Sequence, residues 1–292
     1  MPVPHMTVEL VRLNYIQWSD TFVTEKPYEV ISDVPDGCKK RNFNLSPGPE
    51  QAIHDIRGLE HQFSLDENGF EVRKHAMKNT SATKDDIERY YLPDIKSLLE
   101  NVDPGAEVHI FDWRLRSSDK TRTTREPGST INLDDPTLIL EPVQAVHNDQ
   151  SRLAAIKRVK HHLGDRADKM LARRFRIINV WRPLRYPIEN FPLALCDGTS
   201  VSNEQLLAVD HVRKNYVGES LYPLYSSDMQ WYFLDRQEKD EVLIFKTFDS
   251  STKTSSRCCP HTSFRQSAAR AEHIPRETIE VRALVFSQAD EE

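Results

Sequence analysis

Three side chains in this sequence have the types and the spacing of a metal-binding site. His147 and Asp149 lie two residues apart, at the end of an apolar run that is typical of a strand, residues 137–147. Because strand side chains alternate between two faces, His147 and Asp149 would point the same way, into an apolar interior. His261 begins another expected strand near the C-terminus. Two histidines and one carboxylate form the facial triad that binds Fe(II) and leaves the opposite face of the metal open.

A second set of residues, on the last expected strand, could bind a carboxylate. Arg276 lies 15 residues after His261 (276 − 261), and Thr278 shares its strand face. A guanidinium binds a carboxylate through two parallel hydrogen bonds, and a nearby hydroxyl can donate another. A co-substrate with two carboxylates could therefore chelate the metal at one end and bind Arg276 at the other. Arg282 would lie on the same strand face and is the competing candidate for binding this carboxylate, and Lys246 is a further one. The alternative without a role in binding is a surface ion pair for either arginine. For Lys246 it is an edge position with the side-chain stem on apolar surface.

The composition limits the class of protein. The 292 residues are 38% hydrophobic and 29% charged, which favours a soluble globular protein. The net charge of −6 argues against nucleic acid as a partner. No run approaches the ~20 apolar residues of a membrane span, and the first residues lack the pattern of a signal peptide. The four cysteines form neither a disulfide framework nor a C-x-x-C motif, so we expect a cytoplasmic protein.

The spacing of apolar residues predicts more strands than helices. One helix is expected after the capping sequence Thr83-Lys-Asp-Asp86 and another after Ser151. The expected strands dominate the second half of the chain: residues 7–16, 107–115, 137–147, 175–181, 229–233, 241–248, 261–264 and 278–286. This order favours helices packed against a β-barrel or a double sheet.

We expect a single domain, residues 1–292, that has two parts. Residues 1–106 would supply N-terminal strands and supporting helices, and residues 107–286 would form the β core that carries the metal residues. A polar stretch, residues 117–136, lies directly before the strand that leads to His147. Long loops inside compact domains are often lids over a site, and a flexible insertion is the alternative for this one.

Several longer strings carry a family resemblance. They extend over nearly the whole chain, and those of six or more residues are far more specific than the triad alone. The strings are Arg57-Gly-Leu-Glu60, Phe63-Ser-Leu-Asp66, Phe111-Asp112, Val146-His-Asn-Asp-Gln-Ser151, Asn179-Val-Trp-Arg-Pro-Leu184, Pro192-Leu-Ala-Leu-Cys-Asp197, Phe245-Lys-Thr-Phe-Asp-Ser250, Pro260-His-Thr-Ser-Phe264 and Arg276-Glu-Thr-Ile-Glu-Val-Arg-Ala-Leu-Val-Phe286. In this order they resemble the fungal gibberellin-desaturase-like family, which includes AsaB-type hydroxylase/desaturases and bacterial cephalosporin 7α-methoxylase components.

The resemblance implies an α+β, mainly β protein with a double-stranded β-helix core (a jelly-roll or cupin-like fold) and flanking helices. It also implies Fe(II) and 2-oxoglutarate as cofactors, with O₂ used to hydroxylate or desaturate a small secondary metabolite at an unactivated C–H bond. His147, Asp149 and His261 match the iron ligands expected of the family, and Arg276 matches its expected co-substrate arginine. The expected partner is a small-molecule substrate, with a homodimer as the candidate assembly.

Two alternatives from other classes stay open at this point. A cupin-like metal enzyme could use the triad for isomerisation or hydrolysis without 2-oxoglutarate, and its activity would persist under nitrogen. A non-catalytic partner subunit could keep the fold without binding iron tightly, and it would require a second chain. The intact triad argues against the second alternative.

Overall fold

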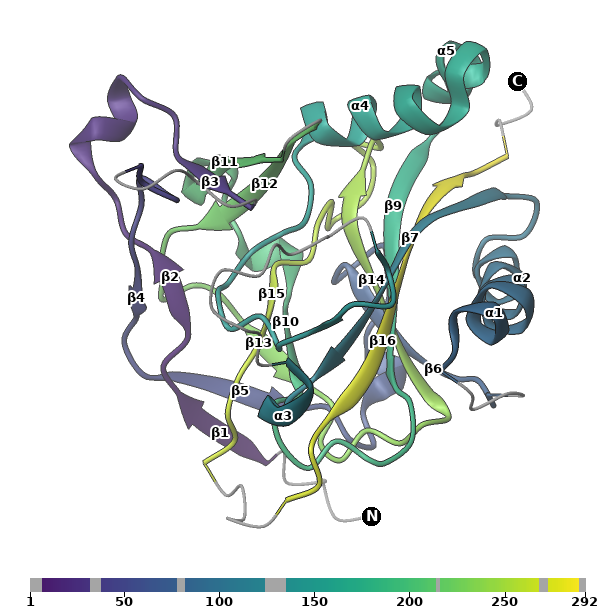
Figure 1. The fold of residues 1–292 in the computed structure, drawn as a ribbon, viewed down its shortest axis with the longest axis horizontal. Helices are drawn as coiled ribbons and strands as arrows, with labels where there is room; N and C mark the ends of the chain where they lie inside the picture. The colour runs from purple at the N-terminus through teal and green to yellow at the C-terminus, as the bar shows by residue number, and fades with distance from the viewer. Residues whose placement is uncertain are drawn as a thin grey trace.

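The computed structural model describes residues 7–31, 38–77, 82–123, 135–213, 216–267 and 273–288. Within these ranges the chain is mainly β, and its longest strands lie in one six-stranded sheet (Figure 1). In spatial order this sheet contains β6 (Phe70–Lys74), β14 (Glu241–Asp249), β9 (Phe175–Pro183), β16 (Glu277–Phe286), β7 (Glu107–Ser117) and β8 (Ile139–Leu140). Its neighbouring strands are antiparallel except for β7 and β8.

A five-stranded sheet packs against the six-stranded one. It contains β1 (Val8–Val11), β5 (Gln51–Asp55), β13 (Trp231–Phe233), β10 (Leu193–Cys196) and β15 (His261–Ser263). A buried cluster joins Trp181 and Phe245 of the larger sheet to Leu193 and Leu195 of β10, so apolar side chains of two facing sheets form this part of the core. Two smaller sheets complete the β structure: β12 (Val217–Pro223), β11 (Leu206–Val212) and β3 (Tyr28–Val30) in one, and β2 (Asn14–Ile16) and β4 (Leu45–Pro47) in the other.

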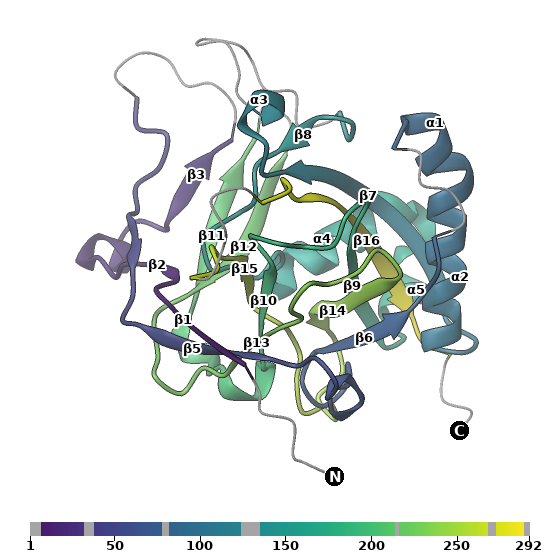
Figure 2. The same cartoon turned by 90° about the horizontal axis from the view of Figure 1, so that it is seen from below.

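Helices cover both faces of the six-stranded sheet. The α-helices are α1 (Lys84–Asp86), α2 (Leu92–Val102), α3 (Lys120–Thr123), α4 (Arg152–Leu163) and α5 (Ala167–Leu171), and a π-helical segment, Ile87–Tyr91, joins the first two. Short 3₁₀ turns are formed by Asp20–Val23, Glu60–Gln62, Gly164–Arg166, Gly198–Ser200 and Asn203–Gln205. The inner face of this sheet is the one toward the five-stranded sheet, and the outer face is the opposite one. Helix α2 packs its apolar stripe against the outer face, whereas α4 and α5 pack across one end of the inner face (Figures 1 and 2). None of the helices in the described ranges is long and apolar enough to cross a membrane.

The expected helix starts and most of the expected strands are confirmed. The hydroxyl oxygen of Thr83 accepts a hydrogen bond from the backbone N–H of Asp86, and that of Ser151 accepts one from Ala154 at 3.1 Å. Both side chains therefore satisfy backbone donors that the first turn of a helix leaves unpaired. The expected strand over residues 7–16 is instead two short strands, β1 and β2, which pair in different sheets.

The strand expected over residues 137–147 was wrong as a continuous element. Only β8 is regular, and the segment that follows makes single bridges to three different partners. Ala145 pairs with Asn14, His147 with His261, and Asn148 with Leu221. Each residue bridges to a different segment, so no ladder forms, although the backbone stays extended enough to keep the alternation of side chains.

The polar stretch 117–136 is shorter as a loop than the sequence indicates. Strand β7 continues through Ser117 and α3 follows at once, which leaves residues 124–134 outside the described ranges. The role of this stretch as a lid therefore stays a prediction.

Close packing of the turn after β10 generates a prediction about stability. A Cβ atom added at Gly198 would lie 2.0 Å from the Ser256 hydroxyl oxygen and 2.1 Å from the backbone carbonyl oxygen of Cys258. We expect Gly198→Ala to lower the free energy of unfolding by about 1–3 kcal/mol, because the backbone that leads into β15 must move. Gly58→Ala is the contrasting variant, since nothing lies within 4 Å of its added Cβ and only its positive φ opposes the change. Urea unfolding of both variants measures the difference, and equal unfolding midpoints for Gly198→Ala and the unmodified chain would contradict it.

Candidate metal centre

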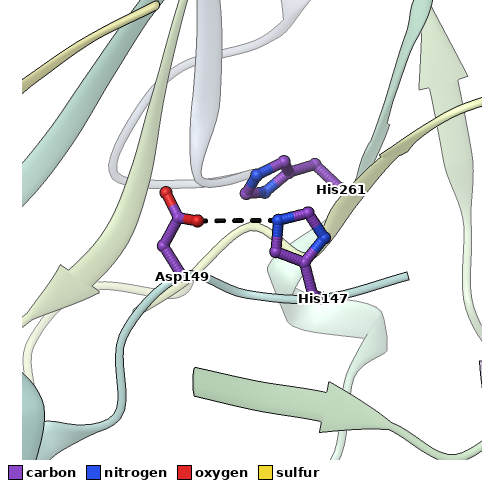
Figure 3. Close-up of side chains that lie close together, drawn as sticks. All are labelled: His147, Asp149 and His261. Carbon is purple, nitrogen blue, oxygen red and sulfur yellow. Dashed lines mark ion pairs between the residues drawn. The ribbon is translucent and has the colours of Figure 1, made fainter. Parts of the chain in front are cut away.

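The three residues of the predicted triad lie together between the two large sheets. His147 and His261 form an antiparallel bridge in which each backbone N–H donates to the other's carbonyl oxygen, at 3.2 and 2.8 Å. This pairing places the two rings side by side, with centroids 4.5 Å apart. The Oδ1 atom of Asp149 lies 3.5 Å from Nε2 of His147 (Figure 3). One candidate ligand atom from each residue lies within 4.8 Å of the other two, which is the arrangement of a metal site.

Hydrogen bonds orient both imidazole rings. The Nδ1 atom of His147 is 2.9 Å from the carbonyl oxygen of Ala145, and that of His261 is 3.0 Å from the carbonyl oxygen of Cys259. A carbonyl oxygen can only accept, so each Nδ1 carries a proton, and in the neutral form of either ring the lone pair that can bind a metal is on Nε2. Burial lowers the pKa of His261 to about 3, so this ring is neutral at ordinary pH, which is the form that binds metal.

The carboxylate of Asp149 is held by two side chains of the six-stranded sheet. Its Oδ2 atom accepts a hydrogen bond of 2.7 Å from the Asn179 amide and lies 3.1 Å from Nε of Arg282. Burial alone would raise the pKa of Asp149, but the charge of Arg282 and the neighbouring histidines hold it well below its ordinary value. The carboxylate is therefore ionised and fixed in orientation.

The structure places Arg282, the competing candidate for the co-substrate clamp, among three carboxylates. Besides Asp149, its guanidinium pairs with Asp112 at 3.0 Å and with Glu280 at 2.5 Å. Its charge is therefore already matched. Asn179 is fully buried on the same inner face, because the register of β9 and β16 sets it opposite Arg282. The sequence reasoning did not assign Asn179 to the site, because its contact with Asp149 depends on a strand register that no local pattern contains.

Arg276 lies in a different environment. It is 2% exposed, and its Nη1 atom donates to the carbonyl oxygen of Phe191 and to the Ser263 hydroxyl. The Nε and Nη2 atoms have no hydrogen-bond partner in the described part of the chain, and neither has the hydroxyl of Thr278 on the same face of β16. Burial, reinforced by nearby Arg116, lowers the pKa of Arg276 to about 9. A buried cation with two unused donors is costly unless a ligand pairs with it.

Lys246 has a structural role that the sequence did not indicate. It is fully buried, and its ammonium donates to Asp249 at 2.9 Å, to Asp66 at 3.2 Å and to the hydroxyl of Thr254 at 3.1 Å. All three ammonium protons therefore have partners on the far side of the site. An edge position with the stem on apolar surface, expected as the structural reading, is wrong for this residue.

A cavity of about 290 Å³ opens beside the triad. We expected an apolar interior, but the lining is largely polar and rich in arginine: it includes Arg114, Arg116, Arg158, Arg282, His211, Tyr222 and Ser220, with His147 and Asp149 at one side. Val143 and Leu140 supply some of its few apolar side chains. The polarity follows from the inner face of β7 and β16, where charged residues alternate with the apolar residues of the outer face.

Comparison with known proteins identifies the family of this chain. Residues 13–286 match the family described as Oxidoreductase/YMDC permease-like domain. An Fe(II)/2-oxoglutarate-dependent dioxygenase of Aspergillus novofumigatus is 30% identical over 275 residues, covering 91% of this chain and 93% of the relative. A hydroxylase/desaturase of Cercospora beticola is 31% identical, covering 82% of this chain and 76% of the relative. The chain belongs to the Fe(II)/2-oxoglutarate-dependent dioxygenases.

Solved structures agree with this assignment. The iron and alpha-ketoglutarate-dependent endoperoxidase NvfI superposes with a TM-score of 0.83 at 27% identity, covering 96% of this chain and 98% of that chain. A second structure of that enzyme, in a different conformation, gives the same TM-score at 26% identity, with the same coverage. The resemblance stated from the sequence strings is therefore confirmed at the level of the family, as are its two cofactors.

The contacts of Asp149 generate a prediction about metal affinity. We expect Asn179→Ala to weaken Fe(II) binding by about 10- to 100-fold, because side chains that orient a metal ligand typically contribute this much. Anaerobic titration with Fe(II), or with Mn(II) as a stable substitute, measures the dissociation constant. Asn203→Ala, in an exposed turn, serves as the control. An unchanged metal affinity in the Asn179 variant would show that Asp149 needs no such support.

Proposed function

We propose that His147, Asp149 and His261 bind the Fe(II) of this dioxygenase and that Arg276 and Thr278 bind the distal carboxylate of 2-oxoglutarate. The observation that carries the proposal is the buried guanidinium of Arg276, whose Nε and Nη2 atoms have no hydrogen-bond partner in the described part of the chain. The unpaired Thr278 hydroxyl lies on the same strand face, so both groups can donate to one carboxylate.

The residues present fit both groups that the family implies. The Nε2 atoms of the two histidines and the ionised carboxylate form a nitrogen and oxygen donor set that suits Fe(II). Ser263 holds one end of the Arg276 guanidinium at 2.7 Å, and the Trp181 ring lies 5.4 Å from its Cζ atom. These contacts fix the plane of the guanidinium and leave its other donors available to a carboxylate.

We also infer that the two large sheets form a double-stranded β-helix. The facing sheets, the antiparallel ladders and the likeness to the endoperoxidase support this finer description of the fold. The division at residue 106, the single domain, the homodimer and the cytoplasmic location stay predictions.

The chain's own residues have distinct tasks in the reaction. When bound, iron with 2-oxoglutarate and O₂ supplies the oxidising power, and the co-substrate leaves as succinate and CO₂ while a C–H bond of the substrate is hydroxylated or desaturated. Asn179 and Arg282 hold the carboxylate of Asp149, and the carbonyl groups of Ala145 and Cys259 keep the Nδ1 protons away from the metal side. Arg276 and Thr278 fix the far end of the co-substrate, so the substrate must enter from the cavity that β11, β12 and α4 line.

The two rival functions have less support. A cupin-like enzyme that works without 2-oxoglutarate gives no reason for a buried, unpaired Arg276 beside the triad. A non-catalytic partner subunit gives no reason for the oriented histidines and the ionised Asp149. Both rivals also differ from the activities of the two fungal relatives, a dioxygenase and a hydroxylase/desaturase.

Purified protein with Fe(II), 2-oxoglutarate and O₂ should release succinate slowly even without its substrate, and Asp149→Ala should abolish both metal binding and this turnover. Succinate measured by chromatography, in air and under nitrogen, provides the test. Formation of succinate that is equal in the Asp149→Ala variant would exclude the proposed iron ligands. Activity on any substrate that persists under nitrogen without 2-oxoglutarate would favour the cupin-like alternative.

The position of the co-substrate arginine gives a separate prediction. We expect Arg276→Leu to raise the 2-oxoglutarate concentration for half-maximal succinate release by about 30-fold or more, because loss of a charged hydrogen-bond pair costs about 2 kcal/mol. Arg282→Leu should instead weaken Fe(II) binding, since Arg282 contacts Asp149. The opposite pattern, in which only Arg282→Leu raises the 2-oxoglutarate requirement, would show that Arg282 and not Arg276 binds the distal carboxylate of 2-oxoglutarate.

A further inference from the structure

An arginine without a hydrogen-bond or ion-pair partner in the described ranges lines the cavity beside the triad. Arg158, on α4, has no hydrogen bond or ion pair with any residue of the described ranges, and its Nε atom is buried. Its Cζ atom lies 5.0 Å from the ring centroid of Phe111 and 5.1 Å from that of Tyr216. Stacked contacts of this kind leave the N–H groups in the plane of the guanidinium free to donate.

The neighbours of Arg158 do not neutralise its charge. The hydroxyl of Tyr216, which also lines the cavity, is buried and has no hydrogen-bond partner among the described residues. Burial and the charge of Arg158 lower the pKa of His162 to about 4, so that ring stays neutral. The Glu219 carboxylate, on the same cavity, is already bound by Lys26 and by the hydroxyl of Ser151. The Arg158 guanidinium and the Tyr216 hydroxyl, neither of which has a hydrogen-bond partner among the described residues, therefore line the same cavity.

Arg158 is too far from Arg276 to serve the same carboxylate. In the pairing of β7 with β16, Arg116 lies opposite Thr278, whereas Asp112, next to Phe111 in the chain, lies opposite Arg282. Six residues of strand separate Arg276 from Arg282, about 20 Å at ~3.3 Å per residue. Arg276 therefore lies at one end of the inner face, and Arg158 lies over the other end, beyond the Asp149–Arg282 pair. A five-carbon co-substrate that chelates the metal and binds Arg276 does not reach Arg158.

Resting on the proposed function, we propose that the substrate oxidised by this enzyme carries a carboxylate, which binds Arg158 and the Tyr216 hydroxyl. An anchored carboxylate at the α4 end would hold the rest of the molecule across the cavity, with its target carbon toward His147 and Asp149. The guanidinium edge accepts a carboxylate through two parallel hydrogen bonds, which also fixes its orientation. The substrate class is thus a small organic acid, and the ring of Tyr216, which lines the cavity beside Arg158, favours an apolar group next to the acid.

The test compares an acid with its own neutral ester. Protein loaded anaerobically with Fe(II) and 2-oxoglutarate is titrated with 2-naphthoate and with methyl 2-naphthoate, and dissociation constants are measured by ligand-observed NMR. The unmodified chain should bind the acid about tenfold more tightly than the ester or better, as expected for a charge-assisted hydrogen bond. Equal affinity for the two probes, or no binding of the acid, overturns the proposal.

Variants assign the preference to Arg158. Arg158→Gln should remove the acid preference and Arg158→Lys should keep part of it, whereas Tyr216→Phe, which retains the ring, should reduce it by about two- to fivefold. Lys160→Gln, an exposed residue of the same helix, is the matched control and should change nothing. An acid preference that persists in both Arg158→Gln and Tyr216→Phe overturns the proposal, and the Tyr216 variant decides it if Arg158→Gln fails to fold.

The same variants distinguish the two sources of a carboxylate. Uncoupled succinate release by Arg158→Gln should require the same 2-oxoglutarate concentration as the unmodified chain. A tenfold increase in that requirement would assign Arg158 to the co-substrate and overturn the proposal. Absence of any 2-oxoglutarate-dependent succinate in the unmodified chain would instead refute the proposed function, whatever the probes do.

Discussion

Asp149 must stay ionised to bind a metal, yet its side chain is only 10% exposed. Desolvation of a carboxylate is expensive, and an isolated one at this position would take up a proton instead. Charged side chains on the inner face of the six-stranded sheet stabilise the ionised form of Asp149. Arg282 lies between Asp149, Asp112 and Glu280, and Arg114 pairs with Asp112 at 3.0 Å. Much of the remaining architecture depends on building this charged face inside a protein.

That requirement explains why the long central strands have two different faces. Alternate residues of β16 carry the charges inward, while Ile279 and Val281 between them pack against α2 on the outer face. Helix α2 therefore supplies the apolar burial that the inner face cannot provide. At the other end of the inner face the inward-facing residues of β16 are the apolar Leu284 and Phe286, and these pack against α4 and α5. Along β16 the inner face is therefore charged at the candidate site and apolar where α4 and α5 pack.

The sequence predicted the triad because its information is local or nearly so. His147 and Asp149 share a face by counting alone, and the strings around His261 and Arg276 identified the family. The spacing of residues along one strand does not predict the register in which that strand pairs with its neighbours. Asn179 reaches Asp149 because β9 pairs with β16 in one particular register, and residues about a hundred positions apart set that register. The same limit explains the segment before His147, where single bridges to three partners replace the expected strand.

The roles proposed for Arg276 and Arg158 depend on how they differ from Arg114 and Arg282, which form ion pairs. Arg114 and Arg282 have carboxylates within 3.1 Å, and both belong to the charge balance that keeps Asp149 ionised. Arg276, Arg158 and Arg116 have no carboxylate partner in the described ranges. Arg116 donates to the backbone carbonyl oxygen of Glu141, whereas Arg276 and Arg158, at opposite ends of the inner face, keep buried N–H donors without a partner there. Because Asp149 and Arg282 are matched so closely at the candidate metal site, we expect the buried donors of Arg276 and Arg158 to be matched as well. Because no carboxylate of the described ranges pairs with them, each is best explained by a carboxylate that arrives with a small molecule, one at each side of the candidate metal site.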